Sequence, residues 1–464
     1  MRAKSILKML STVVTTGMVA AAMALPTMAA GTNYVPIAAQ DATFNKYLLL
    51  EEDMQVPSLT FQYEVSTPAA GIPGDSTHLP LYKGKTVTTT GANAATYPKI
   101  EDVSFGSADA AETSTLLTGY KTYKKTITVD FGDATDASGE NVVKFDEPGV
   151  YRYYIKEVKD TNAAGLYYDV EPTAAGLRTE GDFYRTLDVY VEDATSGTSK
   201  NLKVTGYIMY DGQITGAPNA SADPEAGNTA ITTTKEIEVN GTTTPGVTGA
   251  KKTDNYVNFY DAFSLTFGKE VTGNQGSKDK YFKLSLSLTS PVDVTFTVDI
   301  LKADATVPSN SATDSTYVGK TNTTTISATA NTAVVTDFYL QDGQYITVKG
   351  IPAGTVYDLT EVEEDYKQTE KIVADLSTFS VDTTNDDPTV TYEALGNDVS
   401  GTISNADIYT GYTNAKDGIL PTGVLVKATP VIVIGVLAIA GVVFFAVRNA
   451  KNKDLDDEAE TAEE

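Results

Sequence analysis

The chain has 464 residues, of which 61 are acidic and 35 basic, giving a formal net charge of −26, and it contains one histidine and no cysteine. The lack of cysteine excludes disulfides, thiolate metal sites and a cysteine nucleophile, and the single His78 leaves little scope for histidine catalysis. Nucleic acid is not an expected partner, because its phosphates require a basic surface. The length and the hydrophobic content of 41% suffice for two or three domains.

Residues 1–30 have the pattern of a secretory signal peptide. Basic residues precede an apolar run from Met9 to Leu25, and small residues follow, with cleavage expected at Ala29 or Ala30. A transmembrane helix is the weaker interpretation, because the run is short and is interrupted by serine and threonine. We therefore expect the body of the protein to be exported.

The body reads as β-structure throughout. Apolar and aromatic residues alternate with polar ones, turn signals such as Asp342-Gly343 recur at short intervals, and no long segment has a helical period. Residues 217–250 are rich in Gly, Thr, Ala and Pro, and we expect a long loop there, before the last strand of a first domain. The predicted domains are residues 31–260 and 261–418.

The body also repeats itself, and polar residues stand at matching places in the two copies. Tyr153–Val158 and Tyr357–Val362 share the pattern Tyr-x-Ile/Leu-x-Glu-Val, and Tyr256–Asn258 matches Tyr412–Asn414. A strand pattern with one lysine in an apolar setting precedes each glutamate. Each half thus runs lysine, glutamate, asparagine: Lys46, Glu157 and Asn258, then Lys269, Glu361 and Asn414.

These polar side chains are predicted to lie inside the domains. Residues two apart in a strand share a face, so Lys269 lies with Leu265 and Phe267, and Lys46 lies with Phe44 and Leu48. Burying an unpaired charge is costly, and desolvation lowers the pKa of a lysine and raises the pKa of a glutamate. We expect each core to hold one lysine, one glutamate and one asparagine that pair or neutralise one another.

Such a triad can form an isopeptide bond. The neutral lysine Nζ attacks Cγ of the asparagine, a protonated glutamate polarises the carbonyl and shuttles protons, and ammonia leaves. The alternative is an ordinary buried Lys–Glu pair with a hydrogen-bonded asparagine. Two triads in the same order favour the reactive interpretation.

The sequence resembles the Gram-positive major pilins with isopeptide-linkage domains. The resemblance rests on Phe44–Tyr47, Pro148–Tyr153, Phe267–Gln275 and Tyr412–Gly418. It implies an all-β fold of two tandem immunoglobulin-like (CnaB-like) β-sandwich domains.

The resemblance also implies which residues are joined. The expected bonds are Lys46–Asn258, with Glu157 assisting, and Lys269–Asn414, with Glu361 assisting. Asn255 is an alternative to Asn258, because the first domain carries long insertions.

The C-terminal segment resembles a sortase cell-wall sorting signal. Residues 419–423 read Ile-Leu-Pro-Thr-Gly, with the motif formed by Leu420, Pro421, Thr422 and Gly423 in the Pro-Thr-Gly variant of some pilins. Cleavage is expected between Thr422 and Gly423, and the Thr422 carbonyl would then be joined to an amine.

An apolar stretch follows this motif. Residues 428–447 are long enough to cross a bilayer, and the basic residues after them place the tail, residues 448–464, in the cytoplasm. A plain single-pass anchor would explain the helix but not the Pro-Thr-Gly motif.

Two functions fit this organisation. In the first, the protein is a pilus backbone subunit of a Gram-positive cell wall, and Lys99, Lys83 or Lys85 of one copy accepts the Thr422 carbonyl of another. In the second, it is a monomeric wall-anchored adhesin for a host or neighbouring-cell ligand. The expected partners are a sortase, peptidoglycan or other pilin subunits, and a host surface ligand. No cofactor, metal or activity on external substrates is predicted.

Overall fold

The structure is a computed structural model that describes residues 34–418 with gaps. The gaps are 91–93, 134–140, 161–163, 197, 199, 219–236, 240–241, 245–246, 248–249, 301, 310–314, 373–397 and 405. The predicted signal peptide, sorting motif, apolar stretch and tail lie outside the described residues. Within the described part, no helix is both long and apolar enough to span a membrane.

The described chain is built from β-strands, with one short 3-10 helix, η1 (Ser315–Tyr317). The alternation in the sequence accounts for the strands. In β18 (Phe282–Thr289), for example, the apolar residues are buried and the polar residues between them are only half-buried. The predicted all-β fold is confirmed.

The first half of the chain forms two main sheets. One contains, in order, β13 (Leu202–Asp211), β12 (Tyr184–Asp193), β10 (Gly149–Val158), β3 (Leu59–Ser66) and β7 (Val103–Phe105), with β4 (Leu81–Lys83) also paired to β10. The other contains β11 (Leu166–Tyr167), β16 (Asn255–Tyr260), β2 (Ala42–Glu51) and β8 (Tyr120–Val129). Buried side chains of both sheets belong to one core, which includes Phe44 of β2 and Tyr153 of β10.

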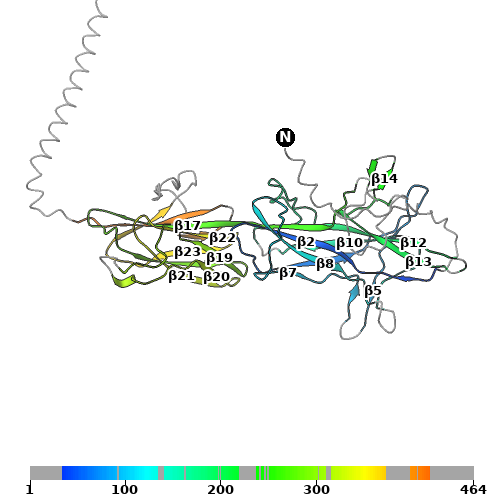
Figure 1. The fold of residues 1–464 in the computed structure, drawn as a ribbon, viewed down its shortest axis with the longest axis horizontal. Coiled ribbons are helices and arrows are strands. Elements are labelled where there is room, and N and C mark those ends of the chain that lie inside the picture. The colour runs from blue at the N-terminus through cyan, green and yellow to red at the C-terminus, as the bar shows by residue number, and fades with distance from the viewer. Residues whose placement is uncertain are drawn as a thin grey trace, which may run out of the picture.

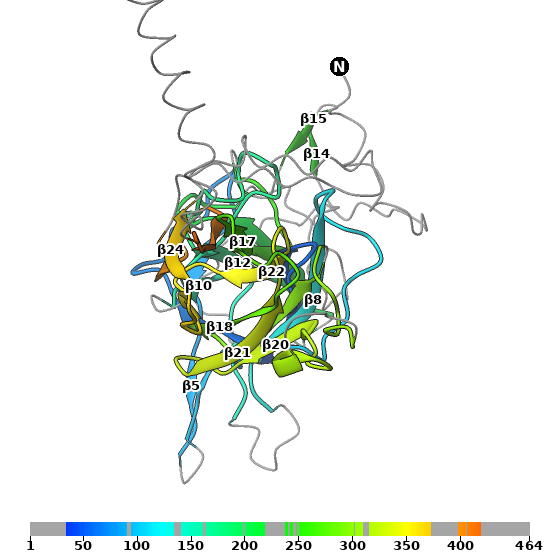
Figure 2. The ribbon, with the colours of Figure 1, turned by 90° about the vertical axis from the view of Figure 1, so that its left-hand side faces the viewer.

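The second half repeats this arrangement. One sheet contains β20 (Thr325–Ala328), β19 (Val294–Asp299), β22 (Tyr345–Pro352), β17 (Ala262–Thr272), β26 (Ile408–Ala415) and β24 (Lys367–Ile372). The other contains β21 (Ala333–Leu340), β18, β23 (Val356–Glu361) and β25 (Ser400–Thr402). Viewed along the molecule, β17 and β22 lie opposite β18 and β21 (Figure 2).

Three small two-stranded sheets complete the described part. They are β1 (Ile37–Ala38) with β9 (Lys144–Phe145), β5 (Val87–Thr88) with β6 (Thr96–Tyr97), and β14 (Ile237–Val239) with β15 (Thr242–Thr244). The β5–β6 hairpin projects from the body (Figure 1, Figure 2). The β14–β15 hairpin lies within residues 217–250, where the sequence predicts only a loop.

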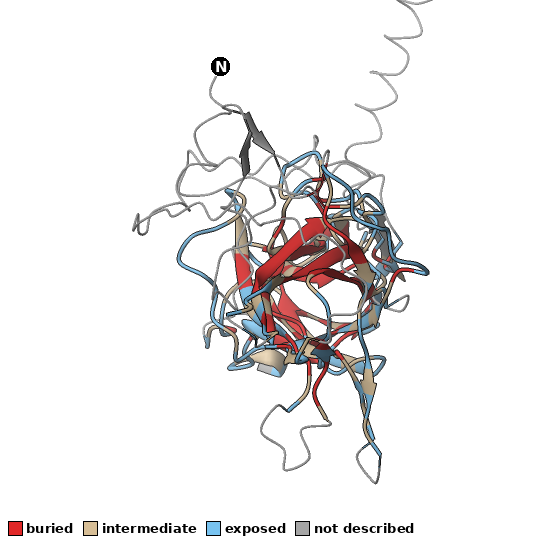
Figure 3. Cartoon of the chain, turned by 90° about the vertical axis from the view of Figure 1, so that its right-hand side faces the viewer, coloured by how far each residue is buried: buried red, intermediate tan, exposed pale blue. Residues whose placement is uncertain are grey.

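The two sandwiches lie end to end (Figure 1). β16 ends at Tyr260 and β17 begins at Ala262, so the last strand of the first sandwich runs directly into the first strand of the second. Lys349 Nζ lies 3.2 Å from Asp53 Oδ2 across the junction. The buried residues gather in the interior, and the exposed ones lie on the outer loops (Figure 3).

Candidate functional site

The first predicted triad is assembled from two facing sheets. β2 and β16 are parallel neighbours, with Lys46 opposite Tyr256, so that Asn258 lies two residues further along the same face. Glu157 comes from β10, in the opposite sheet. Lys46, Glu157 and Asn258 are all fully buried.

The second triad has the same construction. β17 and β26 are parallel neighbours, with Lys269 opposite Tyr412, and Asn414 again lies two residues further on. Glu361 ends β23 of the facing sheet. The side chains of Lys269 and Glu361 and the whole of Asn414 are buried. The strand alternation in the sequence thus places both sets of side chains inside.

In the first triad, contacts converge on one oxygen of Glu157. Lys46 Nζ forms an ion pair with Glu157 Oε1. Asn258 Nδ2 donates to the same oxygen at 3.0 Å, and the Tyr63 hydroxyl donates to it at 3.4 Å. Glu157 Oε2 is buried and has no hydrogen-bond partner among the described residues. A carboxyl with one unpartnered buried oxygen is costly to keep charged.

In the second triad, the glutamate uses its two oxygens separately. Lys269 Nζ lies 2.8 Å from Glu361 Oε2 and 3.4 Å from the Tyr412 carbonyl oxygen, to which it donates. Asn414 Nδ2 donates to Glu361 Oε1 at 2.6 Å. Asn414 Oδ1 is buried without a hydrogen-bond partner in the described part of the chain.

An aromatic ring packs against the lysine amine of each triad. Lys46 Nζ lies 4.4 Å from the centroid of the Phe61 ring, and Lys269 Nζ lies 4.5 Å from that of Phe282. Phe61 belongs to β3 and Phe282 to β18, the strands that pair with the glutamate-bearing strands β10 and β23. Each ring covers its buried amine, and a cation–π contact of this kind favours the charged form of the lysine.

A tyrosine fixes the separation of the facing sheets next to each triad. The hydroxyl of Tyr256 donates to the Ile155 carbonyl at 2.9 Å, and that of Tyr412 donates to the Leu359 carbonyl at 2.9 Å. In both cases the accepting carbonyl lies two residues before the glutamate. The tyrosines that define the sequence repeat therefore hold the asparagine strand against the glutamate strand.

Burial shifts the pKa values of the two lysine amines and of the Glu157 carboxyl. Desolvation lowers the pKa of Lys46 to about 8 and that of Lys269 to about 8, despite the neighbouring glutamates. Desolvation also raises the pKa of Glu157, although Lys46 and Asn258 act in the other direction. Both shifts favour transfer of the proton from amine to carboxylate, which leaves the neutral amine that a nucleophile requires.

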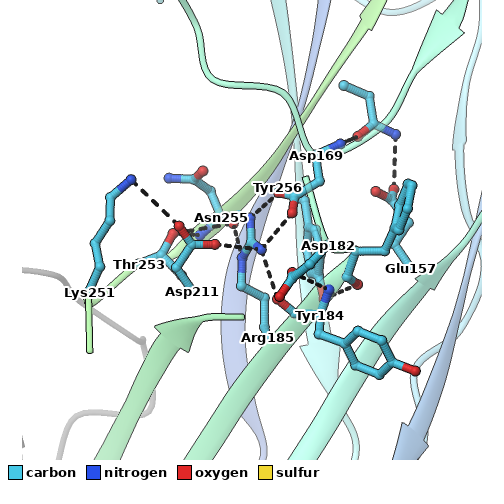
Figure 4. Close-up of polar contacts among 12 residues, drawn as sticks. Glu157, Asp169, Asp182, Tyr184, Arg185, Asp211, Lys251, Thr253, Asn255 and Tyr256 are labelled. Atoms are coloured by element: carbon cyan, nitrogen blue, oxygen red, sulfur yellow. Dashed lines mark hydrogen bonds and ion pairs between the residues drawn. The ribbon is translucent and has the colours of Figure 1, made fainter. Parts of the chain in front are cut away.

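Sequence reasoning missed a further group at the first triad, an ion-pair cluster around Arg185 that reaches Asn258 through Asp169. The Asp169 backbone N–H donates to Asn258 Oδ1 at 3.0 Å, and the Asp169 carboxylate forms an ion pair with Arg185. Arg185 also pairs with Asp211 at 2.9 Å and stacks on Tyr256, 4.2 Å from the ring centroid (Figure 4).

The alternative asparagine of the first domain points elsewhere. Asn255 Nδ2 donates to Asp254 Oδ1 at 2.7 Å, and the Asn255 carbonyl accepts from Arg185. Of the two asparagines, Asn258 is the one that contacts Glu157.

The predicted acceptor lysines lie on the first half of the chain, away from both triads. Lys83 ends β4 and is exposed. Lys85 Nζ pairs with Asp146 at 3.1 Å. Lys99 pairs with Glu101 and lies 3.9 Å from Asp130 Oδ2.

The fold and the triads define a class of protein: tandem β-sandwiches, each with a buried lysine, glutamate and asparagine. Residues 263–416 match a family described as a domain of unknown function (DUF7601). The chain is 28% identical over 197 residues to a curated protein named pilin from Streptococcus pyogenes serotype M1, covering 42% of this chain and 52% of the relative. The predicted resemblance to Gram-positive pilins is confirmed by this match, and the chain spans about half the length of that relative.

Solved pilin structures also align with most of the chain. The major pilin of Streptococcus pyogenes is 18% identical, with a TM-score of 0.44, and the alignment covers 82% of this chain and 100% of the pilin chain. The T-13 major pilin of the same species is 18% identical, with a TM-score of 0.41 and coverages of 83% and 100%.

Proposed function

We propose that the chain is the backbone subunit of a sortase-polymerised pilus on a Gram-positive cell wall, and that each sandwich is cross-linked by a Lys–Asn isopeptide bond that it forms itself. One observation carries the proposal: the lysine, glutamate and asparagine occur twice, buried, with the same two-residue offset between parallel strands. An ordinary buried ion pair requires neither the asparagine nor the repeated offset.

The proposed reaction balances without a cofactor. The lysine ammonium passes a proton to the glutamate, and the neutral Nζ attacks Cγ of the asparagine, so that a C–N bond forms and negative charge develops on Oδ1. The protonated glutamate then gives its proton to Nδ2 and takes one from Nζ. The Cγ–Nδ2 bond breaks, ammonia leaves, and the glutamate ends protonated.

The bonds would lie on the path that carries tension. Lys46 and Asn258 lie on β2 and β16, the first long strand and the last strand of the first sandwich, and Lys269 and Asn414 lie on β17 and β26 of the second. Because β16 runs into β17, force entering near residue 418 would pass through the second bond to β17, on to β16 and through the first bond. A shaft subunit needs such a path, since otherwise each sandwich could be pulled open from its last strand.

The bonds would also stabilise the fold against unfolding. Each closes a loop of more than a hundred residues, 46 to 258 and 269 to 414. Chain-entropy reasoning gives a stabilisation of about 5 kcal/mol for a cross-link of that length. A secreted chain without cysteine has no disulfide to provide the same constraint.

Cell-wall extracts of the native host test the pilus function. We expect antibodies against this chain to detect a ladder of high-mass species that resists boiling in SDS. The ladder should be lost when Thr422 and Gly423 are deleted. Single Lys-to-Arg changes at positions 83, 85 and 99 identify the acceptor, because only one of them should abolish the ladder. A single band in the wild-type extract contradicts the pilus proposal and favours the monomeric adhesin.

A further inference from the structure

The side-chain amide of Asn258 has a fixed orientation in the first triad. Its Oδ1 faces the backbone N–H of Asp169 at 3.0 Å, and its Nδ2 faces Glu157 Oε1 at 3.0 Å. A backbone N–H can only donate, so the amide atom opposite it must be the oxygen. The leaving nitrogen therefore faces the carboxyl, and the oxygen that gains charge during attack faces the backbone.

The residue that supplies this N–H is held in an uncommon conformation. Asp169 has φ of 52°, in the left-handed region that few non-glycine residues adopt. Its carboxylate forms an ion pair with the buried Arg185, and its carbonyl accepts from the Gly181 N–H at 3.0 Å. Left-handed residues of this kind persist where the surroundings fix them, often at functional sites.

We propose that the Asp169 N–H stabilises the oxyanion that forms on Asn258 Oδ1 when Lys46 attacks, and that Arg185 is the positioning residue that fixes Asp169. This inference rests on the proposed function, because it assigns a role within the Lys46–Asn258 reaction. As Nζ bonds to Cγ, the carbonyl π electrons move to Oδ1, and the N–H already points at that oxygen. Collapse of the intermediate returns those electrons to the carbonyl as ammonia leaves.

In the first triad, carbonyl polarisation and proton transfer are thus carried out by different groups. The backbone N–H polarises the carbonyl, so Glu157 is left with proton transfer from Nζ to Nδ2. The second triad has no counterpart among the described residues, because Asn414 Oδ1 has no hydrogen-bond partner there. The two sites share their triad but differ in how they stabilise the developing charge.

Substitutions at position 169 separate the role of the backbone from that of the ion pair. Asn and Gly both lack the negative charge but adopt left-handed φ readily, whereas Ala lacks the charge and adopts that φ poorly. The full chain is synthesised in a cell-free system with detergent, synthesis is stopped with an inhibitor, and samples are quenched at intervals. The cross-linked peptides Lys46–Asn258 and Lys269–Asn414 are quantified by mass spectrometry. The rate of formation of the second peptide is the internal reference for the first in the same chain.

We expect Asp169→Asn and Asp169→Gly to form the Lys46–Asn258 bond within about threefold of the wild-type rate. Asp169→Ala should be about tenfold slower, as the cost of a left-handed alanine implies. Arg185→Met should also slow the first bond, because it leaves the buried Asp169 carboxylate charged and without its partner, whereas Asn and Gly at position 169 remove that charge. The second bond should keep its rate in every variant. Equal rates for Asn, Gly and Ala, whether all unchanged or all slowed, would overturn the oxyanion role. Absence of both cross-links from the wild type would instead contradict the proposed function.

Discussion

Replacing Glu361 by glutamine should remove the cross-link of the second sandwich while keeping its shape. The amide fills nearly the same volume as the carboxyl and can still contact Asn414, but it cannot carry protons from Lys269 Nζ to Asn414 Nδ2. The chain should therefore retain the ammonia that the wild type loses at this site.

The loss of stability follows from the length of the loop. A cross-link from residue 269 to residue 414 contributes about 5 kcal/mol by restricting the unfolded chain. For a domain of this size each kcal/mol changes Tm by about 2–4 °C, so the melting transition of the second sandwich should fall by about 10–20 °C. Part of any further loss would come from Lys269, left buried without its carboxylate.

Calorimetry with intact mass on the same samples checks this prediction. The double variant Lys269→Met/Glu361→Gln is the matched control, because it lacks the bond and also the unpaired amine. Its Tm should be well below that of the wild type and at or above that of Glu361→Gln. The reasoning is refuted if Glu361→Gln has lost the cross-link by mass and yet melts within about 2 °C of the wild type.

Three further changes probe the first sandwich. Asn258→Ala leaves Lys46 unreacted, with a pKa of about 8 in the folded protein and 10.5 in the unfolded chain. Between these values the unfolded chain binds more protons, so the free energy of unfolding should rise from pH 8 to 10. The control Lys46→Met/Asn258→Ala should lack that slope. Asn255→Ala should leave the Lys46–Asn258 cross-link intact by peptide mapping, and its loss would point to Asn255 as the reactive residue. Tyr256→Phe should lower the free energy of unfolding by about 1 kcal/mol in denaturant titrations without changing the mass deficit, and a lost cross-link would show that the hydroxyl is needed for the reaction.

The alternation of residues was enough to predict which side chains of the triads face inward. Lys46 and Lys269 stand in runs of alternating apolar residues, and a one-residue change in register would have moved them to solvent. The matching Tyr-x-Asn strings then indicated that the asparagines lie on equivalent strands. The two-residue offset from lysine to asparagine depends on parallel pairing, which no local pattern specifies.

The role of Asp169 could not be read from the sequence. It contributes a backbone N–H rather than a side chain, and it lies 89 positions from Asn258 in a segment without strand periodicity. Its partner Arg185 lies in β12, where an arginine would ordinarily be assigned to the solvent face. The aromatic residues Phe61 and Phe282 were likewise indistinguishable from other core residues until the pairing of β3 with β10 and of β18 with β23 was known.

The central claim is that both buried lysines are joined to asparagine, and the intact mass of the body, residues 31–422, tests it most directly. We expect a mass below the calculated value by two ammonia equivalents, with one restored in Glu157→Gln, one in Glu361→Gln and both in the double variant. A wild-type mass equal to the calculated value would contradict the claim and leave two ordinary buried ion pairs.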